Sequence, residues 1–583
     1  MERYLRCAVL MLFIAPLIVH AQNYADLDIN NVRARFLSNG SLTEFEAPNG
    51  SGTYVSSSAN LWMGGRDANN SLHLAAVRFN QVGEDWWPGP LSNDGSASIT
   101  PAVSAQYDNV WNVHTAEVVE YQAYCNCLQD PNCDVSIQFP GYQMPGYFNT
   151  WPAMGDQQAA QDPYLAPFID FNADGIYDPA DCDVPCSPGD QSLYFIYNDK
   201  LDVHTESGGL QMGVEVQARP FAFNGPSAAL ANTIFVEYRI INRGKLTLTD
   251  FHAGLFIDFD LGFLGDNHSG CDAAKDLWYG YSDDPVSAIA FGATILCGLI
   301  NDYDGTDWTP DSALVAFNGY GSGDGILDNE RQGMMHFVTH NNDGTVTGDP
   351  ALAIHYYGYM KGFWKDNSQW LYGGRGHFSD TLADPDTPTR YLFPDATDPM
   401  GFGTGGVPQA PWSQVSVGLD PSDIRGVGSM GPVTLEPGAI HRIMVAFVYA
   451  DAGSGGPLAS VQALQARVDS IRAFAYSHDY CYSFGTELPC PEALVGIHDP
   501  MDMDGGTITL RPVPTSGILN IRLSASLQRA SLRVVDGIGR TVMIEGKSNS
   551  DSRSLDVSHL ANGHYTLIAD LDGLRGHARF TKE

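Results

Sequence analysis

The sequence predicts a mainly β protein of more than one domain, in which a β-sandwich or jelly-roll-like body with one clear helix precedes a small C-terminal antiparallel β-sandwich. The 583 residues exceed the roughly 250 to 300 at which a single hydrophobic core stops growing. A content of 44% hydrophobic residues with 61 Gly and 34 Pro indicates many turns between short strands, and excludes a disordered or collagen-like chain. Short segments that alternate apolar and polar residues recur along the chain, as half-buried strands do.

The first 21 residues have the pattern of a secretory signal peptide. Arg3 and Arg6 precede an apolar run over residues 7–19, and the small residue Ala21 stands before Gln22. The run is too short to cross a bilayer, so we expect cleavage after Ala21. No later stretch approaches the roughly 18 uninterrupted apolar residues of a membrane span, and we expect no transmembrane segment in the mature chain.

The body, residues 22–496, contains most of the predicted strands. Four segments with period-two alternation are spaced like consecutive hairpins, and five more continue the pattern. The four are residues 193–197, 211–218, 233–241 and 251–259, and the five are 312–317, 334–339, 351–359, 415–417 and 443–449. A helix is predicted after Pro457, because apolar residues recur at intervals of three and four up to Phe474. The Gly-, Pro- and Asp-rich stretch 372–412 predicts a long ordered loop or a connection between domains.

The charge of the chain limits its partners. Against 31 Lys and Arg there are 68 Asp and Glu, a formal net charge of -37, which repels phosphate backbones and excludes nucleic acid as a partner. The acids are 53 Asp and 15 Glu. Because Asp is the carboxylate of turns and oxygen-ligand metal loops, whereas helices favour Glu, the composition favours calcium loops over solvated helix faces. We therefore expect Ca²⁺ in a structural role.

The sharpest motif is the twelve-residue segment 170–181. A seven-coordinate Ca²⁺ takes oxygen ligands from loop positions 1, 3, 5, 9 and 12 and a backbone carbonyl from position 7, with Gly at position 6 for the turn. These ligands are Asp170, Asn172, Asp174, the carbonyl of Ile176, Asp178 and Asp181, and Gly175 occupies the turn. The segment resembles the dockerin type of calcium loop, which ends in Asp, more than the EF-hand, which ends in Glu. The alternative is an Asx-turn loop that only mimics the spacing.

Two further acidic groups are candidate calcium sites. The first comprises Asp258, Asp260, Asp266 and Asp272, and the second comprises Asp324 and Asp328. The first two members of the first group end a predicted strand and therefore point to the same face, and the turn that follows would bring the other two to them. The second group looks like half of the 170–181 loop.

The ten cysteines favour an oxidising compartment. Loss of Cys7 with the signal peptide leaves nine, so one thiol is left over. The short-range disulfides that we consider are Cys182 with Cys186 and Cys481 with Cys490. Zinc is not expected at the cysteines of residues 125–133, because neither a CxxC pair nor a matching His spacing accompanies them.

The sequence contains no GxSxG, HExxH or P-loop motif, and this removes the easily recognised hydrolases, zinc proteases and nucleotide enzymes. His336 and His340 share a face if their segment is a strand, which leaves a metal pair or an ordinary strand with two polar positions. The aromatic segments 85–91 and 363–372 either expose rings for stacking on sugars or pack in the core. Glycoside hydrolysis by a carboxylate pair also stays open, because no spacing selects a pair.

The C-terminal residues differ in composition. Residues 505–583 hold 10 Lys and Arg against 7 Asp and Glu, whereas residues 22–504 hold 19 against 60. This change predicts a separate module after a linker at residues 497–504. Its short alternating segments are punctuated by Gly517 and Gly563, which predicts the small antiparallel sandwich.

Four sequence blocks in this module occur in a fixed order. They are residues 512–517, 536–540, 555–560 followed by 563–565, and 579–582. The blocks resemble the type A sorting domain of the type IX secretion system of Bacteroidota, although Val513 stands where Asn is usual and Arg579 where Lys is usual. The resemblance implies export across the outer membrane by that machinery, with a cell-surface sortase as a second partner.

The body resembles a group of large secreted Bacteroidota proteins. The resemblance lies in residues 31–36, 61–65, 86–91, 164–168, 260–262 and 270–272. It implies location and architecture without a reaction.

We therefore expect a secreted or cell-surface, calcium-stabilised β protein exported by the type IX route, with a structural or adhesive role, or glycan binding as its specific form, rather than an enzyme. The alternative is a secreted hydrolase of glycans or peptides with an unrecognised carboxylate site. Converging carboxylates of raised pKa in a cleft would favour the hydrolase, and an open aromatic platform would favour the binder.

Overall fold

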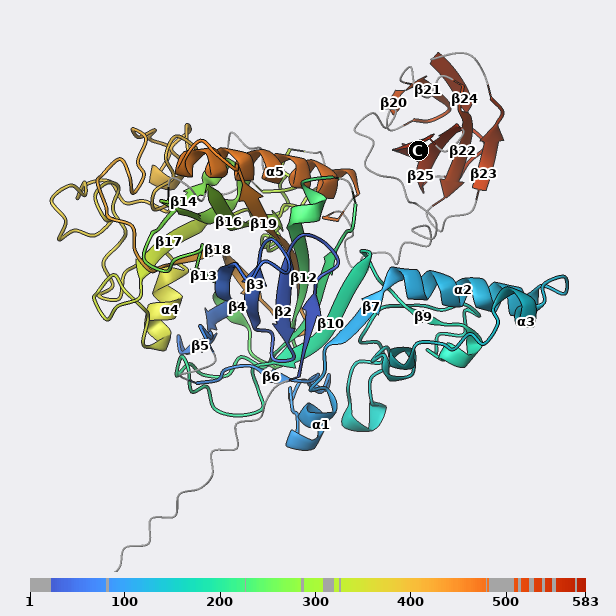
Figure 1. The fold of residues 1–583 in the computed structure, drawn as a ribbon, viewed down its shortest axis with the longest axis horizontal. Helices are drawn as coiled ribbons and strands as arrows, with labels where there is room; N and C mark the ends of the chain where they lie inside the picture. The colour runs from blue at the N-terminus through green and yellow to red at the C-terminus, as the bar shows by residue number, and fades with distance from the viewer. Residues whose placement is uncertain are drawn as a thin grey trace, which may run out of the picture. The chain divides into compact units, whose positions relative to one another are not determined.

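The computed structural model describes residues 23–481 apart from 80–82, 226, 285–287, 308–318, 324–326 and 479, and residues 508–582 apart from 512–514, 524–528, 537–540, 548–551, 562 and 572–573. The chain forms two compact units, Met1–Val495 and Gly496–Glu583 (Figure 1). The predicted signal peptide, the predicted linker and the strand predicted at 312–317 lie outside the described residues.

Two antiparallel sheets build the first unit. One has the strand order β1-β2-β3-β4-β13-β18-β17 with β5 beside β4, and the other has the order β14-β15-β16-β19-β12-β11-β10-β6 with β7 beside β10. The strands of the first sheet are β1 (Tyr24–Leu27), β2 (Arg33–Leu37), β3 (Leu42–Glu46), β4 (Tyr54–Arg66), β5 (Leu72–Ala75), β13 (Leu248–Phe259), β17 (His336–Asn341) and β18 (Ile424–Leu435). Those of the second are β6 (Trp87–Pro88), β7 (Trp111–His114), β10 (Gln191–Asn198), β11 (Val214–Ala222), β12 (Thr233–Asn242), β14 (Asn267–Asp272), β15 (Leu277–Ser282), β16 (Ile289–Cys297) and β19 (Ile440–Asp451).

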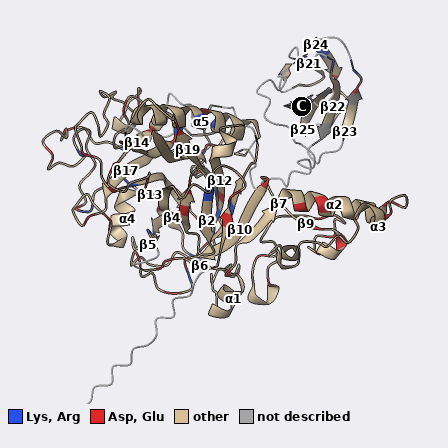
Figure 2. Ribbon diagram, in the orientation of Figure 1, with Lys and Arg blue, Asp and Glu red and all other residues tan. Residues whose placement is uncertain are grey.

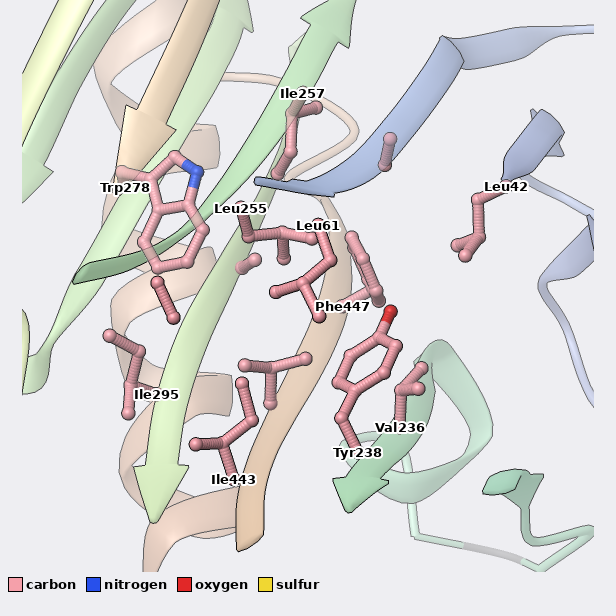
Figure 3. Packing of buried hydrophobic residues seen from close by; sticks show 14 of the residues in the cluster. Leu42, Leu61, Val236, Tyr238, Leu255, Ile257, Trp278, Ile295, Ile443 and Phe447 are labelled. Carbon is pink, nitrogen blue, oxygen red and sulfur yellow. The ribbon is translucent and has the colours of Figure 1, made fainter. Parts of the chain in front are cut away.

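Hydrophobic side chains that alternate along these strands fill the space between the sheets (Figure 3). Leu255 and Ile257 of β13 meet Tyr238 of β12 and Phe447 of β19 in this core, and none of the four is more than 2% exposed. Burial of a large apolar side chain contributes about 1.5–3 kcal/mol, so this layer holds the two sheets face to face. The mainly β, sandwich-like body expected from the alternation is confirmed.

The outer faces of both sheets are covered. Helix α5 (Pro457–Ser477) lies on β16 and β19 and buries Leu464, Val468 and Ile471, as its three- and four-residue spacing predicts. On the other sheet, helix α4 (Ala353–Tyr359) and the loops after it pack on Trp62 of β4 and Phe256 of β13. Phe256 points away from the central core because successive residues of a strand face opposite sides.

A disulfide-tied insert separates β7 from β10. It begins with α2 (Thr115–Gln129) and α3 (Val135–Gln138) and returns through β8 (Phe168–Ile169) and β9 (Val184–Pro185), which pair with each other. Its own hydrophobic cluster includes Tyr121, Phe148 and Trp151 and reaches Tyr194 and Ile196 of β10. The remaining short helices of the body are α1 (Pro101–Gln106), η1 (Gly146–Thr150), η2 (Gln157–Ala159), η3 (Pro179–Asp181), η4 (Leu230–Asn232), η5 (Ala273–Lys275) and η6 (Phe402–Thr404).

Two predicted strands are wrong. Residues 353–359 form helix α4, because the aromatic side chains that suggested a strand, Tyr356 and Tyr357 among them, are packed with Met360 on one helical face. Residues 415–417 form a turn in which Ser413 and Ser416 hydrogen-bond to each other's backbone. Both errors arise because short aromatic or β-branched runs do not distinguish strand from helix or turn by periodicity alone.

Two of the disulfides in the described residues are long-range and one is local. Cys182 pairs with Cys125 and Cys481 pairs with Cys297, so both short-range pairings that the sequence suggested are wrong. Cys127 pairs with Cys133. Tertiary packing brings the two distant pairs together, and the sequence alone does not fix such connectivity. Cys271 is the free thiol among the described cysteines, and it is buried.

The second unit is a small antiparallel sandwich. One sheet has the order β20-β21-β24 and the other has the order β23-β22-β25-β26. The strands are β20 (Ile508–Arg511), β21 (Ile518–Leu523), β22 (Ser531–Asp536), β23 (Thr541–Glu545), β24 (Ser552–Asp556), β25 (Gly563–Leu571) and β26 (Leu574–Lys582). Leu519, Ile521, Leu532, Val534 and Leu567 meet in its core, which confirms the predicted fold of this region.

Candidate metal centres

The 170–181 segment follows β8 and turns back on itself through backbone hydrogen bonds to Asp170. The Asp170 carboxylate accepts the N–H groups of Ala173 and Gly175, each at 2.7 Å. Gly175 has φ of 80°, a conformation that glycine adopts without strain. Position 1 of the loop is therefore joined to position 6, and this brings the later oxygen ligands round toward Asp170.

Three of the predicted ligands converge inside this turn. The Asn172 amide nitrogen lies 3.1 Å from Asp174 Oδ2 and 3.4 Å from Asp181 Oδ2. Asp178 instead begins η3, with its Oδ1 accepting the N–H of Ala180 at 2.8 Å. The Ile176 side chain is 59% exposed, as expected where only its carbonyl would bind an ion.

Asp183 closes the loop and was not predicted from the sequence. Its buried carboxylate accepts the N–H of Phe171 at one end of the loop and of Asp178 near the other, both at 2.8 Å. Burial raises the pKa of Asp183, and the charges of Asp170 and Asp174 add to the rise. The available sequence signal for Asp183 was its position directly after Cys182, two residues beyond the twelve-residue pattern.

A second cluster lies where β13 ends beside β18. Carboxylate oxygens of Asp258, Asp260 and Asp423 lie within 4.8 Å of one another. The sequence predicted the first two, whereas Asp423 reaches them because Phe259 pairs with Ile424 in the sheet. On the other side of β13, Ser57 is the extra residue of an irregular pairing with β4, and its hydroxyl donates to Asp258 Oδ2 at 2.5 Å.

The second cluster carries more negative charge than its surroundings neutralise. Burial and the charge of Asp260 raise the pKa of Asp258 to about 7, although Arg425 Nε lies 3.0 Å from Asp258 Oδ1. Burial raises the pKa of Asp260 as well, and within the described residues its buried Oδ1 has no hydrogen-bond partner. Three carboxylates facing one guanidinium leave two negative charges, and oxygen-only donors are what Ca²⁺ takes. The residues therefore fit a divalent cation.

The other predicted ligands lie elsewhere. Asp266 precedes β14, where the charges of Asp284 and Asp283 add to the effect of burial in raising its pKa. Asp272 ends the same strand, about 20 Å further along, and accepts a hydrogen bond from Gln465 of α5. These two residues cannot share one ion, so the expectation that the turn brings both to Asp258 is corrected.

The third predicted group is only partly described. Asp324 lies outside the described residues. Asp328 Oδ1 accepts the N–H groups of Asp304 and Gly305, each at 2.8 Å. The oxygen of Asp328 is thus occupied in holding two loop segments together.

Buried ion pairs continue from the second cluster into the layer under α4. Arg425 lies 3.6 Å from Asp349, whose other oxygen lies 2.7 Å from Arg78. Arg78 in turn lies 3.1 Å from Glu206, which also accepts the Tyr356 hydroxyl at 3.2 Å. Each charged group in this series of ion pairs has a partner of opposite charge. A charge that is removed from water needs such a partner to be stable in the interior.

The aromatic and histidine candidates from the sequence are buried or half-buried. Trp86, Trp364 and Trp370 are at most 3% exposed, so the core-packing alternative describes them. His336 and His340 share one face of β17 but stand about 13 Å apart along the strand, too far for one ion. Burial lowers the pKa of both imidazoles.

Comparison with known proteins identifies the second unit. Residues 509–574 match the family described as the secretion system C-terminal sorting domain. No curated protein matches the chain. Among solved structures, a polysaccharide lyase is similar at 9% identity over 69% of this chain with a TM-score of 0.16, and the chain spans 36% of that protein. No helix in the described ranges is long and apolar enough to cross a membrane. The C-terminal unit is therefore a sorting domain, which indicates export to the cell surface or secretion by the type IX system.

Proposed function

We propose that this protein is a calcium-stabilised β protein of the cell surface or the secreted fraction, with a structural or adhesive role that takes the specific form of glycan binding. The type IX outer-membrane machinery and its sortase would be its partners during export, through residues 505–583. The observation that carries the calcium part is the convergence of Asp258, Asp260 and Asp423, together with a buried carboxylate oxygen of Asp260 that has no hydrogen-bond partner among the described residues.

A cation at this cluster would join three parts of the first sheet. Asp258 and Asp260 belong to the end of β13, Asp423 precedes β18, and Ser57 belongs to β4. The ion would offset the repulsion that raises the pKa of Asp258. Extracellular calcium is abundant enough for modest affinity, and oxygen-ligand sites in extracellular modules bind with Kd of about 10⁻⁴–10⁻³ M.

The experiment is thermal unfolding of the mature protein with Ca²⁺ and with a chelator, together with the metal content of the purified protein. A site at a free ion concentration 100 times its Kd adds about 2.7 kcal/mol to the free energy of unfolding. Asp260→Asn should remove most of the calcium-dependent gain, whereas Asp420→Asn, which changes an exposed carboxylate in the same loop as Asp423, should keep it. Absence of bound Ca²⁺ and no response to the chelator would refute the proposal.

A secreted hydrolase is the second candidate, and the raised pKa values of Asp258 and Asp260 favour it. A carboxylic acid with a pKa near 7 can donate a proton at neutral pH. The metal content of the purified protein distinguishes the two candidates. If the protein binds no Ca²⁺ and cleaves glycans or peptides, and Asp258→Asn abolishes cleavage without loss of folding, the hydrolase replaces the calcium site.

A further inference from the structure

A cavity of about 320 Å³ lies on the disulfide-tied insert, between α2 and the 170–183 segment. Tyr121 and Tyr124 of α2 form one side of it, together with Tyr142. Asp178 and Pro179, at the start of η3, form another. Its size falls at the lower end of the roughly 300–1,000 Å³ of small-molecule sites, which is enough for one or two sugar rings.

The three tyrosine rings that line the cavity are nearly parallel. The ring centroids of Tyr121 and Tyr124 are 6.1 Å apart with planes at 17°, and those of Tyr121 and Tyr142 are 6.3 Å apart with planes at 16°. The Tyr124 and Tyr142 centroids are 4.9 Å apart at 32°. The three rings pack against one another and form one aromatic wall, and the C–H face of a pyranose packs on an aromatic surface through apolar contact.

Polar groups accompany the rings. The Tyr142 hydroxyl is buried and has no hydrogen-bond partner within the described part of the chain. A buried hydroxyl without a partner is destabilising, so this group is suited to a ligand that hydrogen-bonds. The exposed Asn149 amide and the Asp178 carboxylate also line the cavity, and both suit sugar hydroxyls.

The charge around the cavity selects for neutral sugars. None of the described residues that line it is basic. Helix α2 carries Glu117 and Glu120 and no Lys or Arg (Figure 2). Both glutamates lie close enough to raise the pKa of Tyr142, whose rise to about 12 is due first to burial. A uronate, sialate or sulfate group would meet these carboxylates without a lining Lys or Arg to pair with it.

From this geometry we propose that the Tyr121, Tyr124 and Tyr142 cavity binds a neutral hexose residue of an extracellular glycan. The site rests on and deepens the proposed glycan binding, and its second wall belongs to the calcium loop predicted at residues 170–181. The Tyr121 hydroxyl donates to the Pro179 carbonyl, and the Cys125–Cys182 disulfide ties α2 to the end of that loop. Calcium in the loop holds this wall in place.

The test is binding of the mature protein to immobilised neutral oligosaccharides, namely gluco-, manno-, galacto- and xylo-oligomers, beside uronate-containing oligomers. Tyr124→Ala should weaken binding of the best neutral ligand at least roughly tenfold, a loss of about 1.4 kcal/mol. Tyr142→Phe, which removes only the hydroxyl, should weaken it by a smaller factor. Tyr303→Ala, at a tyrosine that is 78% exposed and outside the cavity, should bind as the unaltered protein does.

Bound calcium is measured on the same samples, so that the two proposals fail separately. Binding of Ca²⁺ with no binding of any neutral oligomer, or equal binding by the Tyr124→Ala and unaltered proteins, overturns the sugar site and leaves the calcium proposal intact. Neutral-sugar binding that is lost in Tyr124→Ala but occurs without bound Ca²⁺ supports the sugar site and overturns the calcium proposal.

Discussion

Two disulfides in the insert close loops of very different length, and their removal should therefore differ in effect. Cys125 and Cys182 are 57 residues apart, whereas Cys127 and Cys133 are 6 apart. The loop-closure entropy model assigns about 4 kcal/mol of stabilisation to the first loop and about 2 kcal/mol to the second. Paired alanine substitutions at each disulfide should thus lower the free energy of unfolding of the insert by different amounts, with the longer loop losing about twice as much.

The structure also says where the effect should appear. The Cys125–Cys182 disulfide joins α2 to the residue beside Asp183, inside the cluster that contains Trp151. Hydrogen exchange of α2 amides, with urea unfolding followed by tryptophan fluorescence, measures the local and the global loss. Losing this disulfide should increase exchange throughout α2, whereas losing Cys127–Cys133 should increase it near the end of the helix.

The shorter disulfide serves as the matched control, because each double variant removes one disulfide from the same helix. Equal losses of stability in the two double variants, or a larger loss for the 6-residue loop, would refute the entropic argument. Unchanged exchange of α2 after loss of Cys125–Cys182 would show that hydrophobic packing alone holds the insert on β10.

Three further predictions follow from particular contacts. Gly428→Ala places a Cβ 2.4 Å from Trp278 in the central core, so urea unfolding should show a loss of at least about 1–3 kcal/mol, whereas Gly225→Ala, with open space around it, should change stability little. Burial and a neighbouring arginine lower the pKa of His441 to about 4. The free energy of unfolding should therefore fall as the pH drops from about 6.5 toward 4, by about 2 kcal/mol at pH 5. His441→Gln should remove that part of the acid sensitivity in pH-dependent unfolding. Asp183→Ala should weaken calcium binding by the 170–181 loop roughly tenfold in titration calorimetry, because both of its backbone hydrogen bonds hold the loop closed; unaltered affinity would contradict that role.

Local patterns in the sequence predict where many of the strands lie, but they do not predict which strands pair with each other. β12 and β13 alternate because one face lies in the central core, and this alternation is visible in the residues themselves. The neighbours of β13 are β4 and β18, which are distant in sequence, so no local pattern predicts that order. The strand predicted over α4 is wrong because a seven-residue apolar pattern does not distinguish a helix from a strand. The packing of its tyrosines decides for the helix, and that packing is not visible in the local sequence.

The same distinction explains which site residues were predictable. Every predicted ligand of the 170–181 loop comes from one segment, so spacing alone is enough to propose Asp170, Asn172 and Asp174. Asp423 joins Asp258 only through the pairing of β13 with β18. The tyrosine cavity likewise needs α2 to lie against a segment that the chain reaches more than fifty residues later, a contact fixed by the Cys125–Cys182 disulfide.

The surroundings of Asp258 favour an ion over a reacting substrate. An acid or base must come within about 3 Å of the group that it protonates, but Asp258 is only 4% exposed. Ca²⁺ is small enough to be enclosed by such groups, and its two positive charges equal the negative charge that Asp258, Asp260 and Asp423 leave after pairing with Arg425. The burial of Asp258 and a charge matched to a divalent cation support the proposed scaffold role of this cluster, and the tyrosine cavity on the insert stays the proposed sugar site.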